Sequence, residues 1–508
     1  MTAPVVAPPV DGRTSAASAG AAAPLAVGAG AALLGALGSW VPSVWADEAA
    51  TISATTRPWG ALGRLVENID AVHAVYYAVV HVWFGVVGTS VLTLRLLSAI
   101  AVGVAAAGVV VLGRTLAGPA VGMAAGVVFA VLPRVTWMAT EGRSSALAAA
   151  AAVWLTVLLV AAVRRGGAGW WVAYAVAAGL AVDLWMFLGF LVAAHGAAVL
   201  WARVGARRVL AFAAAAAVAV GLAAPVVLRA AGQAGQVSWI PPVGLRTLRS
   251  VAVDQWFGTD GVLSLPLALV CWAAVLVAVV RGARRPQERP GPLGQRSLLV
   301  VALPWLVLPT AGVVAYSLVA APMYAGKYLA FSVPALALLV GAAVAAVRPV
   351  SRRVLVLAVV ALLAVPSYLS ERVVTAKDAS DWRLVAEHVD RVSRPGDAVV
   401  FTDVLDAEGA SRFPGRIVAA AYPDVFAPLD DPTRAGSAWR DGTLWDRTVP
   451  LDAAADGLRA ADRVLLVADL ARSGDGPELR TLQGLGLRVV DVWEGTQTAV
   501  LVLEPGRA

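Results

Sequence analysis

The chain has 508 residues, of which 59% are hydrophobic and only 14% charged, and its mean hydropathy is +0.76. These values exclude an ordinary soluble domain and predict a protein whose main solvent is a lipid bilayer. The net charge of +7 comes largely from loops between apolar segments, so it gives no support to a nucleic-acid-binding protein. The single cysteine, Cys271, excludes an internal disulfide and a multi-cysteine zinc site.

The order of apolar segments predicts an α-helical polytopic membrane protein. Residues 1–21 are rich in Ala, Pro and Ser and predict a disordered cytoplasmic leader. A helix needs about 20 apolar residues to cross a bilayer. On that basis we expect about eleven spans within a membrane domain 22–372, at 22–40, 92–112, 119–133, 143–163, 170–182, 185–201, 209–228, 261–280, 297–318, 328–347 and 354–371. The apolar segment 70–88 carries His and Tyr, so we interpret it as an interfacial helix in an outer loop 41–91.

Arginines set the expected orientation in the cell membrane. Clusters such as 164–165, 207–208 and 281–296 fall in alternate loops, which the positive-inside rule assigns to the cytoplasm. The N-terminus is therefore expected inside, and an odd number of spans places the chain after about residue 372 outside. Nearly all acidic residues before that point fall on the outer side, so we expect any chemistry there.

Composition changes near residue 373, and residues 373–508 predict a water-soluble α/β domain on the external side. We expect helices at 381–391 and 478–484, and strands at 397–401, 463–467, 488–492 and 498–503. The domain contains no phosphate-binding loop and no His-Glu metal motif, so we assign it no chemistry. A lid or acceptor-docking module and a structural cap are the two alternatives.

A pair of carboxylates, Asp47 and Glu48, directly follows the first expected span. The low dielectric at a membrane exit favours proton uptake, which suits a general base. Successive helical side chains point about 100° apart, so one carboxylate could take a proton while the other orients an acceptor hydroxyl. The alternative is an ordinary helix start with acidic residues near the positive end of the dipole.

Further polar residues cluster on the same expected face. His73, Tyr77 and His81 recur every four residues, with Tyr76 beside them, and suit the wall of an acceptor cavity or simple interfacial anchoring. Cations on the outer face run against the charge bias, so they need either a bound anion such as phosphate or an acidic partner. These cations are Arg95, Arg143 and Lys327, with Glu141 and Tyr328 as neighbours in sequence.

Together these motifs resemble the GT-C membrane glycosyltransferases, and more narrowly the actinobacterial mannosyltransferase-like branch related to protein O-mannosyltransferases. The resemblance covers about residues 25–370. Its motifs are Trp45-Ala46-Asp47-Glu48-Ala49, Asp70-Ala71-Val72-His73 leading to Tyr76-Tyr77 and His81-Val82-Trp83, Thr93-Leu94-Arg95-Leu96, Glu141-Gly142-Arg143-Ser144, and Lys327-Tyr328-Leu329 before Pro334.

The resemblance implies an inverting transferase that moves mannose, or a pentose such as arabinose, from a polyprenyl-phosphate donor to a glycan, lipid or protein acceptor outside the membrane. Asp47 would match the family's base and Glu48 would help to hold the acceptor, while Lys327 would lie near the lipid phosphate. No cofactor is required, with a divalent cation (Mg or Mn) left open. Ser145 and Lys327 depart from the tyrosine and arginine common in relatives, and Lys cannot contact phosphate through a bidentate fork.

Two other classes of function compete with the transferase. A transporter or flippase of lipid-linked cell-envelope precursors would carry ionisable residues at mid-membrane depth and spans broken by Gly or Pro. Asp183 is a lone acidic residue amid apolar sequence, and it fits an outer turn between two short spans. An inactive scaffold that binds proteins through its soluble domain is the third alternative.

Overall fold

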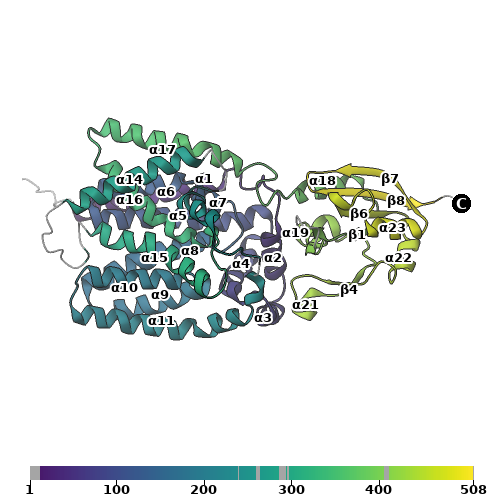
Figure 1. Cartoon of the computed structure of the whole chain (residues 1–508), viewed down its shortest axis with the longest axis horizontal. Coiled ribbons are helices and arrows are strands. Elements are labelled where there is room, and N and C mark those ends of the chain that lie inside the picture. Colours follow the sequence, from purple (N-terminus) through teal and green to yellow (C-terminus); the bar gives the residue numbers. More distant parts are fainter. Residues whose placement is uncertain are drawn as a thin grey trace, which may run out of the picture.

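A computed structural model describes residues 12–237, 239–258, 264–284, 293, 297–405 and 411–506. Figure 1 shows a bundle of long helices with a smaller α/β domain at one end, and short helices α2 to α4 between the two. Residues 1–11 of the expected leader and part of the arginine-rich loop 281–296 lie outside the described residues.

Each of the eleven expected spans coincides with a helix of the bundle. Seven described helices are long and apolar enough to cross a membrane, and an eighth span results if α6 and α7 are one span with a 63° bend. The helices of the bundle, including the shorter apolar helices α1, α9 and α10, are α1 (Gly12–Ala36), α5 (Val91–Ala117), α6 (Pro119–Val131), α7 (Pro133–Ala139), α8 (Ser145–Arg165), α9 (Ala168–Leu184), α10 (Leu188–Trp201), α11 (Ala206–Gly232), α14 (Leu265–Ala283), α15 (Leu298–Val319), α16 (Val333–Ala345) and α17 (Val350–Ser370). The chain is therefore a multi-pass helical membrane protein.

Two boundaries differ from the sequence-based expectation. Helix α1 begins at Gly12, so residues 12–21 are helical where we expected disordered chain, because their many alanines favour helix. The sixth and seventh helices meet at Leu132, whose extended backbone precedes Pro133. Proline disfavours helical geometry in the residue before it, which explains why the expected span 119–133 continues as the separate helix α7.

Short elements form the end of the bundle next to the α/β domain. The first of these follow the span α1 directly and include the apolar segment that we expected at the interface. They are α2 (Ala46–Thr55), α3 (Trp59–Asn68), η1 (Ala71–His73) and α4 (Ala74–Val87), followed later in the chain by η2 (Ala234–Val237), α12 (Leu245–Arg249), the π-helical turn η3 (Ser250–Asp254), α13 (Gln255–Phe257) and η5 (Gly326–Ser332).

The α/β domain contains a four-stranded sheet of order β1-β6-β8-β7, in which only the β1–β6 pair is parallel. All the strands and helices expected in this domain are present. Their bounds are α18 (Trp382–Val392), β1 (Ala398–Phe401), β6 (Val464–Asp469), α23 (Pro477–Gly484), β7 (Leu487–Glu494) and β8 (Thr498–Pro505). Between them lie β2 (Val404–Leu405), β3 (Ser411–Phe413), α19 (Ile417–Ala421), α20 (Pro423–Phe426), β4 (Arg434–Gly436), α21 (Ala438–Asp441), β5 (Arg447–Thr448), α22 (Ala455–Ala460) and η6 (Leu470–Arg472).

The α/β domain is fixed to helices α2 to α4 through a common hydrophobic core. Buried residues of the outer loop, including Leu62 and Tyr76, pack in one cluster with Trp382 and Ile417 of the domain. Polar contacts reinforce this core: Arg57 Nη1 donates to the carbonyl of residue 443 at 3.1 Å, and Ser53 Oγ donates to that of residue 444 at 2.6 Å. A contiguous core of this kind favours a fixed cap over a freely moving lid.

The orientation of the chain can be tested by cysteine labelling. We expect a cysteine at position 290 to be accessible from the cytoplasm and one at position 440 from outside, because charge bias and an odd number of spans place them on opposite sides. The native Cys271 is fully buried, so background labelling should be low. Labelling of both positions from one side would overturn the predicted topology.

Candidate active site

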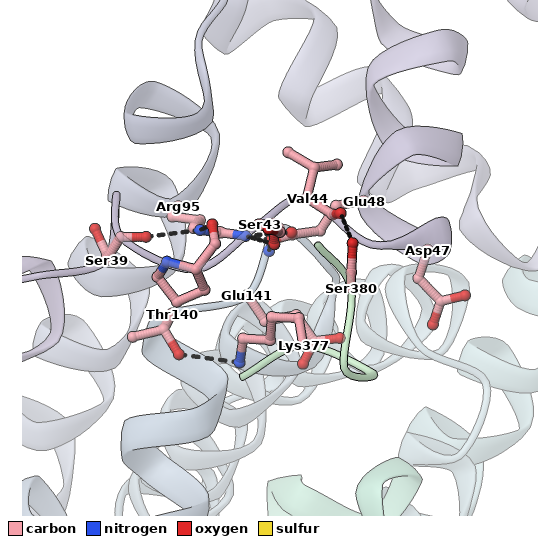
Figure 2. Close-up of polar contacts among 12 residues, drawn as sticks. Ser39, Ser43, Val44, Asp47, Glu48, Arg95, Thr140, Glu141, Lys377 and Ser380 are labelled. Atoms are coloured by element: carbon pink, nitrogen blue, oxygen red, sulfur yellow. Dashed lines mark hydrogen bonds and ion pairs between the residues drawn. The ribbon is translucent and has the colours of Figure 1, made fainter. Parts of the chain in front are cut away.

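The two adjacent carboxylates at the start of α2 point in different directions (Figure 2). The Asp47 side chain is 37% exposed, whereas the Glu48 side chain is completely buried. Both lie in the first turn of α2, where the helix dipole favours negative charge. The separation of about 100° between neighbours on a helix therefore gives the two residues different environments, and only Asp47 can meet a substrate.

Glu48 forms a buried ion pair with Arg95 of α5. The carboxylate accepts from Arg95 Nε at 2.8 Å and Nη2 at 2.5 Å. The remaining N–H groups of Arg95 donate to the carbonyls of Ser39, Pro42 and Ser43, so all five donors are used. In this structure Arg95 has no donor left for a phosphate and Glu48 no exposed oxygen for an acceptor. Both residues hold the loop between α1 and α2 in place.

The segment 140–143, between α7 and α8, links the surrounding elements. The backbone N–H of Gly142 donates to Glu48 Oε1 at 2.7 Å, and its carbonyl accepts from Thr51 Oγ1 at 3.1 Å. A Cβ at Gly142 would lie 2.4 Å from the Leu94 side chain, so this close approach requires glycine. The carbonyl of Glu141 accepts from Ser98 of α5. The segment is therefore fixed against both α2 and α5.

Arg143 reaches from this segment into the exposed part of the site. Its Nη1 donates to the backbone carbonyl of Asp47 at 3.1 Å, and its Nη2 donates to His73 Nε2 at 2.7 Å. Burial alone lowers the pKa of Arg143, but Asp47, Tyr77 and Asp70 more than offset that effect and raise it, so the guanidinium stays charged. A permanent cation thus lies directly behind Asp47.

Lys327 of η5, from the C-terminal part of the membrane domain in sequence, lies next to Asp47. Its Nζ lies 3.5 Å from Asp47 Oδ2, although the two residues are 280 positions apart in sequence. The ammonium also lies over the rings of Trp45 at 4.8 Å, Trp239 at 5.4 Å and Tyr328 at 5.8 Å. The faces of these rings attract the ammonium and hold it beside Asp47.

Only part of the expected polar stripe on the interfacial helix reaches this site. His73 contacts Arg143, and Tyr77 donates to Asp70 Oδ2 at 2.7 Å. Tyr76 is completely buried, and its hydroxyl has no hydrogen-bond partner among the described residues. His81 Nδ1 donates to the carbonyl of residue 55, and its ring packs against a tryptophan of α3 at 4.2 Å. The burial of Tyr76 gives it a packing role, and the half-buried His81 has the same role through its contacts with residue 55 and the tryptophan ring.

Glu141 and Lys377 are both buried and lie near one another at the junction with the α/β domain (Figure 2). Burial raises the pKa of Glu141 to about 8, an effect that Lys377 and Lys327 oppose and that Asp47 and Glu48 reinforce. One oxygen of the Glu141 carboxyl, Oε2, is buried and accepts no hydrogen bond within the part of the chain that the structure describes. Sequence reasoning missed Lys377 as a site residue, although it is one of only two lysines in the chain.

Comparison with known proteins supports the fold. No protein-family description matches the sequence, and no curated protein matches it. Among solved structures, the chain is similar to ArnT from Cupriavidus metallidurans bound to undecaprenyl phosphate, with 15% identity and a TM-score of 0.59 over 93% of this chain and 96% of that one. It also matches AglB from Archaeoglobus fulgidus in complex with an inhibitory peptide and a dolichol-phosphate, with 11% identity and a TM-score of 0.46 over 88% and 69% of the two chains.

The similarity to ArnT extends over nearly the whole of both chains, including the α/β domain. It confirms the fold class expected from the sequence, a polytopic bundle of membrane helices followed by a C-terminal α/β domain.

Proposed function

We propose that the chain is an inverting glycosyltransferase that moves a sugar from a polyprenyl-phosphate donor to an acceptor hydroxyl at the external membrane face. The observation that carries this proposal is the pairing of the exposed Asp47 carboxylate with Lys327, beside Arg143. A base and two cations within one site are what a displacement with an anionic leaving group needs. The fold shared with a protein that binds undecaprenyl phosphate supports the donor class.

The reaction follows from where these groups lie. The acceptor oxygen attacks the anomeric carbon and forms the new glycosidic bond, while its proton passes to Asp47. The bond between the anomeric carbon and the phosphate oxygen breaks on the opposite face, and the polyprenyl phosphate leaves with the electron pair. Lys327 and Arg143 stabilise the charge that develops on that phosphate. A single displacement inverts the configuration, so mannose and arabinose donors would each give the inverted product.

Glu141 has a distinct task in this scheme. Its pKa of about 8 keeps the carboxyl protonated at neutral pH. A protonated carboxyl can donate a hydrogen bond to a phosphate oxygen, whereas a carboxylate repels the phosphate. We therefore place Glu141 on the donor side of the site, with Tyr328, whose ring lies beneath Lys327.

The proposal is tested by measuring transfer from purified polyprenyl-phosphate mannose and polyprenyl-phosphate arabinose in nanodiscs, with glycan, lipid and peptide acceptors offered in turn. We expect transfer from one donor with inversion at the anomeric carbon. Movement of the lipid-linked sugar across the bilayer without transfer to any acceptor would instead identify a flippase.

Replacing Lys327 or Arg143 by alanine should weaken donor use, because a charge-assisted hydrogen bond to phosphate contributes about 1.5–3 kcal/mol. Lys327→Arg should retain activity, since it keeps the cation. The measurement is the KM for donor together with direct binding of undecaprenyl phosphate. If the alanine variants use the donor as the parent does, these cations serve only to pair with Asp47 and its neighbours.

A further inference from the structure

Lys377 lies in the linker between α17 and the α/β domain, yet its side chain is only 2% exposed. Its Nζ forms an ion pair with Glu371 Oε2 at 2.9 Å and donates to Thr140 Oγ1 at 3.1 Å. The ammonium also lies 5.6 Å from the ring centre of Trp137 on α7. Figure 2 shows Lys377 beside Thr140 and Glu141.

This contact joins the linker to the segment that shapes the site. Segment 140–143 carries Arg143, which contacts Asp47 and His73, and it is fixed to α2 and α5 through Gly142 and Glu141. Lys377 adds a third contact, because its ammonium donates to Thr140, the first residue of that segment. It does so from the linker, which is itself tied to the loop before α2 because Ser380 Oγ donates to the Val44 carbonyl at 2.7 Å.

We propose that Lys377 is a positioning residue of the active site: it holds segment 140–143, and with it the Glu141 carboxyl, in the place where the donor phosphate binds. This inference rests on the proposed transferase function. Lys377 itself would not touch the sugar or the phosphate. Through this residue, the docking of the α/β domain against the membrane bundle would affect donor binding.

The charges around Glu141 give the inference a measurable consequence. Lys377 and Lys327 favour its ionised form, whereas Asp47 and Glu48 disfavour it, and Arg134 of α7 interacts with both Glu141 and Glu371. Removing the Lys377 charge should therefore raise the pKa of Glu141 further. Donor binding needs the protonated carboxyl in our scheme, so binding should persist to higher pH.

The experiment compares Lys377→Gln with the matched variant Glu371→Gln. Both remove the same ion pair and keep a side chain that can form hydrogen bonds, but only the first removes the cation beside Glu141. Transfer and binding of undecaprenyl phosphate are measured from pH 6 to 10 in nanodiscs, with Lys377→Arg as the rescue variant and Glu141→Gln as the control that cannot ionise.

For the parent we expect binding and transfer to fall above about pH 8, where Glu141 ionises. Lys377→Gln should lower kcat severalfold and move the fall in binding and transfer to higher pH. Glu371→Gln should leave that fall at or below the parental pH. Lys377→Arg should restore both kcat and the parental pH profile. Glu141→Gln should abolish the fall.

Two results would overturn the inference and leave the transferase function intact: a Lys377→Gln variant with parental kcat and pH profile, or identical profiles for Lys377→Gln and Glu371→Gln, which indicate a purely structural ion pair. A parental chain that binds the lipid phosphate but transfers no sugar would instead overturn the proposed function, while the pH dependence of binding would still decide the role of Lys377.

Discussion

Asp47→Asn is expected to lower the rate of sugar transfer by about a hundredfold or more. The amide has nearly the shape of the carboxylate but cannot accept the proton of the acceptor hydroxyl. Because the Asp47 side chain is 37% exposed and the amide has nearly the same volume, the fold should tolerate the change. Transfer should be measured under saturating donor, so that the effect on kcat is separated from binding.

Controls for this variant come from the same chain. Asp456→Asn removes a fully exposed aspartate whose partner is Arg459 in the α/β domain, and it should leave transfer unchanged. Binding of undecaprenyl phosphate to Asp47→Asn should be retained or tighter, because Lys327 loses the carboxylate with which it pairs. A folded Asp47→Asn variant that transfers sugar at the parental rate would eliminate Asp47 as the base.

Sequence reasoning singled out Asp47 and Lys327 because each has a local signal. Asp47 follows a long apolar segment, and Lys327 is a cation on a face where charge bias disfavours cations. Neither signal shows how far apart the two residues lie in the folded chain. The structure adds that these residues, 280 positions apart, lie within 3.5 Å of one another.

The burial of the Glu48 carboxylate could not be predicted from the sequence. Helical periodicity shows that Asp47 and Glu48 diverge, but it does not show which of them faces the bundle. That choice depends on Arg95, whose partners include the carbonyls of the loop before α2. Backbone carbonyls carry no sequence signal, so an arginine that fixes a loop looks the same as one that binds phosphate.

The buried position of Lys377 could not be predicted from the sequence for a related reason. It stands where the composition changes from apolar to charged, and a lysine in such a stretch is ordinarily solvated. Its burial depends on docking of the α/β domain against the bundle, which involves residues such as Val44 and Ser380 that are distant in sequence. A long-range contact of this kind has no periodic pattern.

Breaking the buried ion pair between Glu48 and Arg95 should lower the free energy of unfolding far more than any single change at the exposed part of the site. Glu48→Ala is expected to cost about 3–5 kcal/mol of unfolding free energy, because it leaves the guanidinium of Arg95 buried without its counter-charge. The Gly142 N–H also loses its acceptor. Glu48→Gln keeps an oxygen for both donors and should cost less, with transfer reduced less than by Asp47→Asn. Equilibrium unfolding in mixed micelles measures the difference.

A double variant separates the charge from the hydrogen bonds. Glu48→Leu with Arg95→Met removes both charges, and an apolar pair of similar volume often replaces a buried ion pair without loss. Recovery should nevertheless be partial, because the carbonyls of Ser39, Pro42 and Ser43 lose the donors that Arg95 supplies. The double variant should therefore be more stable than Glu48→Ala and less stable than the parent. If Glu48→Ala alone unfolds like the parent, Glu48 is not needed to neutralise Arg95, and the structural role assigned to this ion pair is wrong.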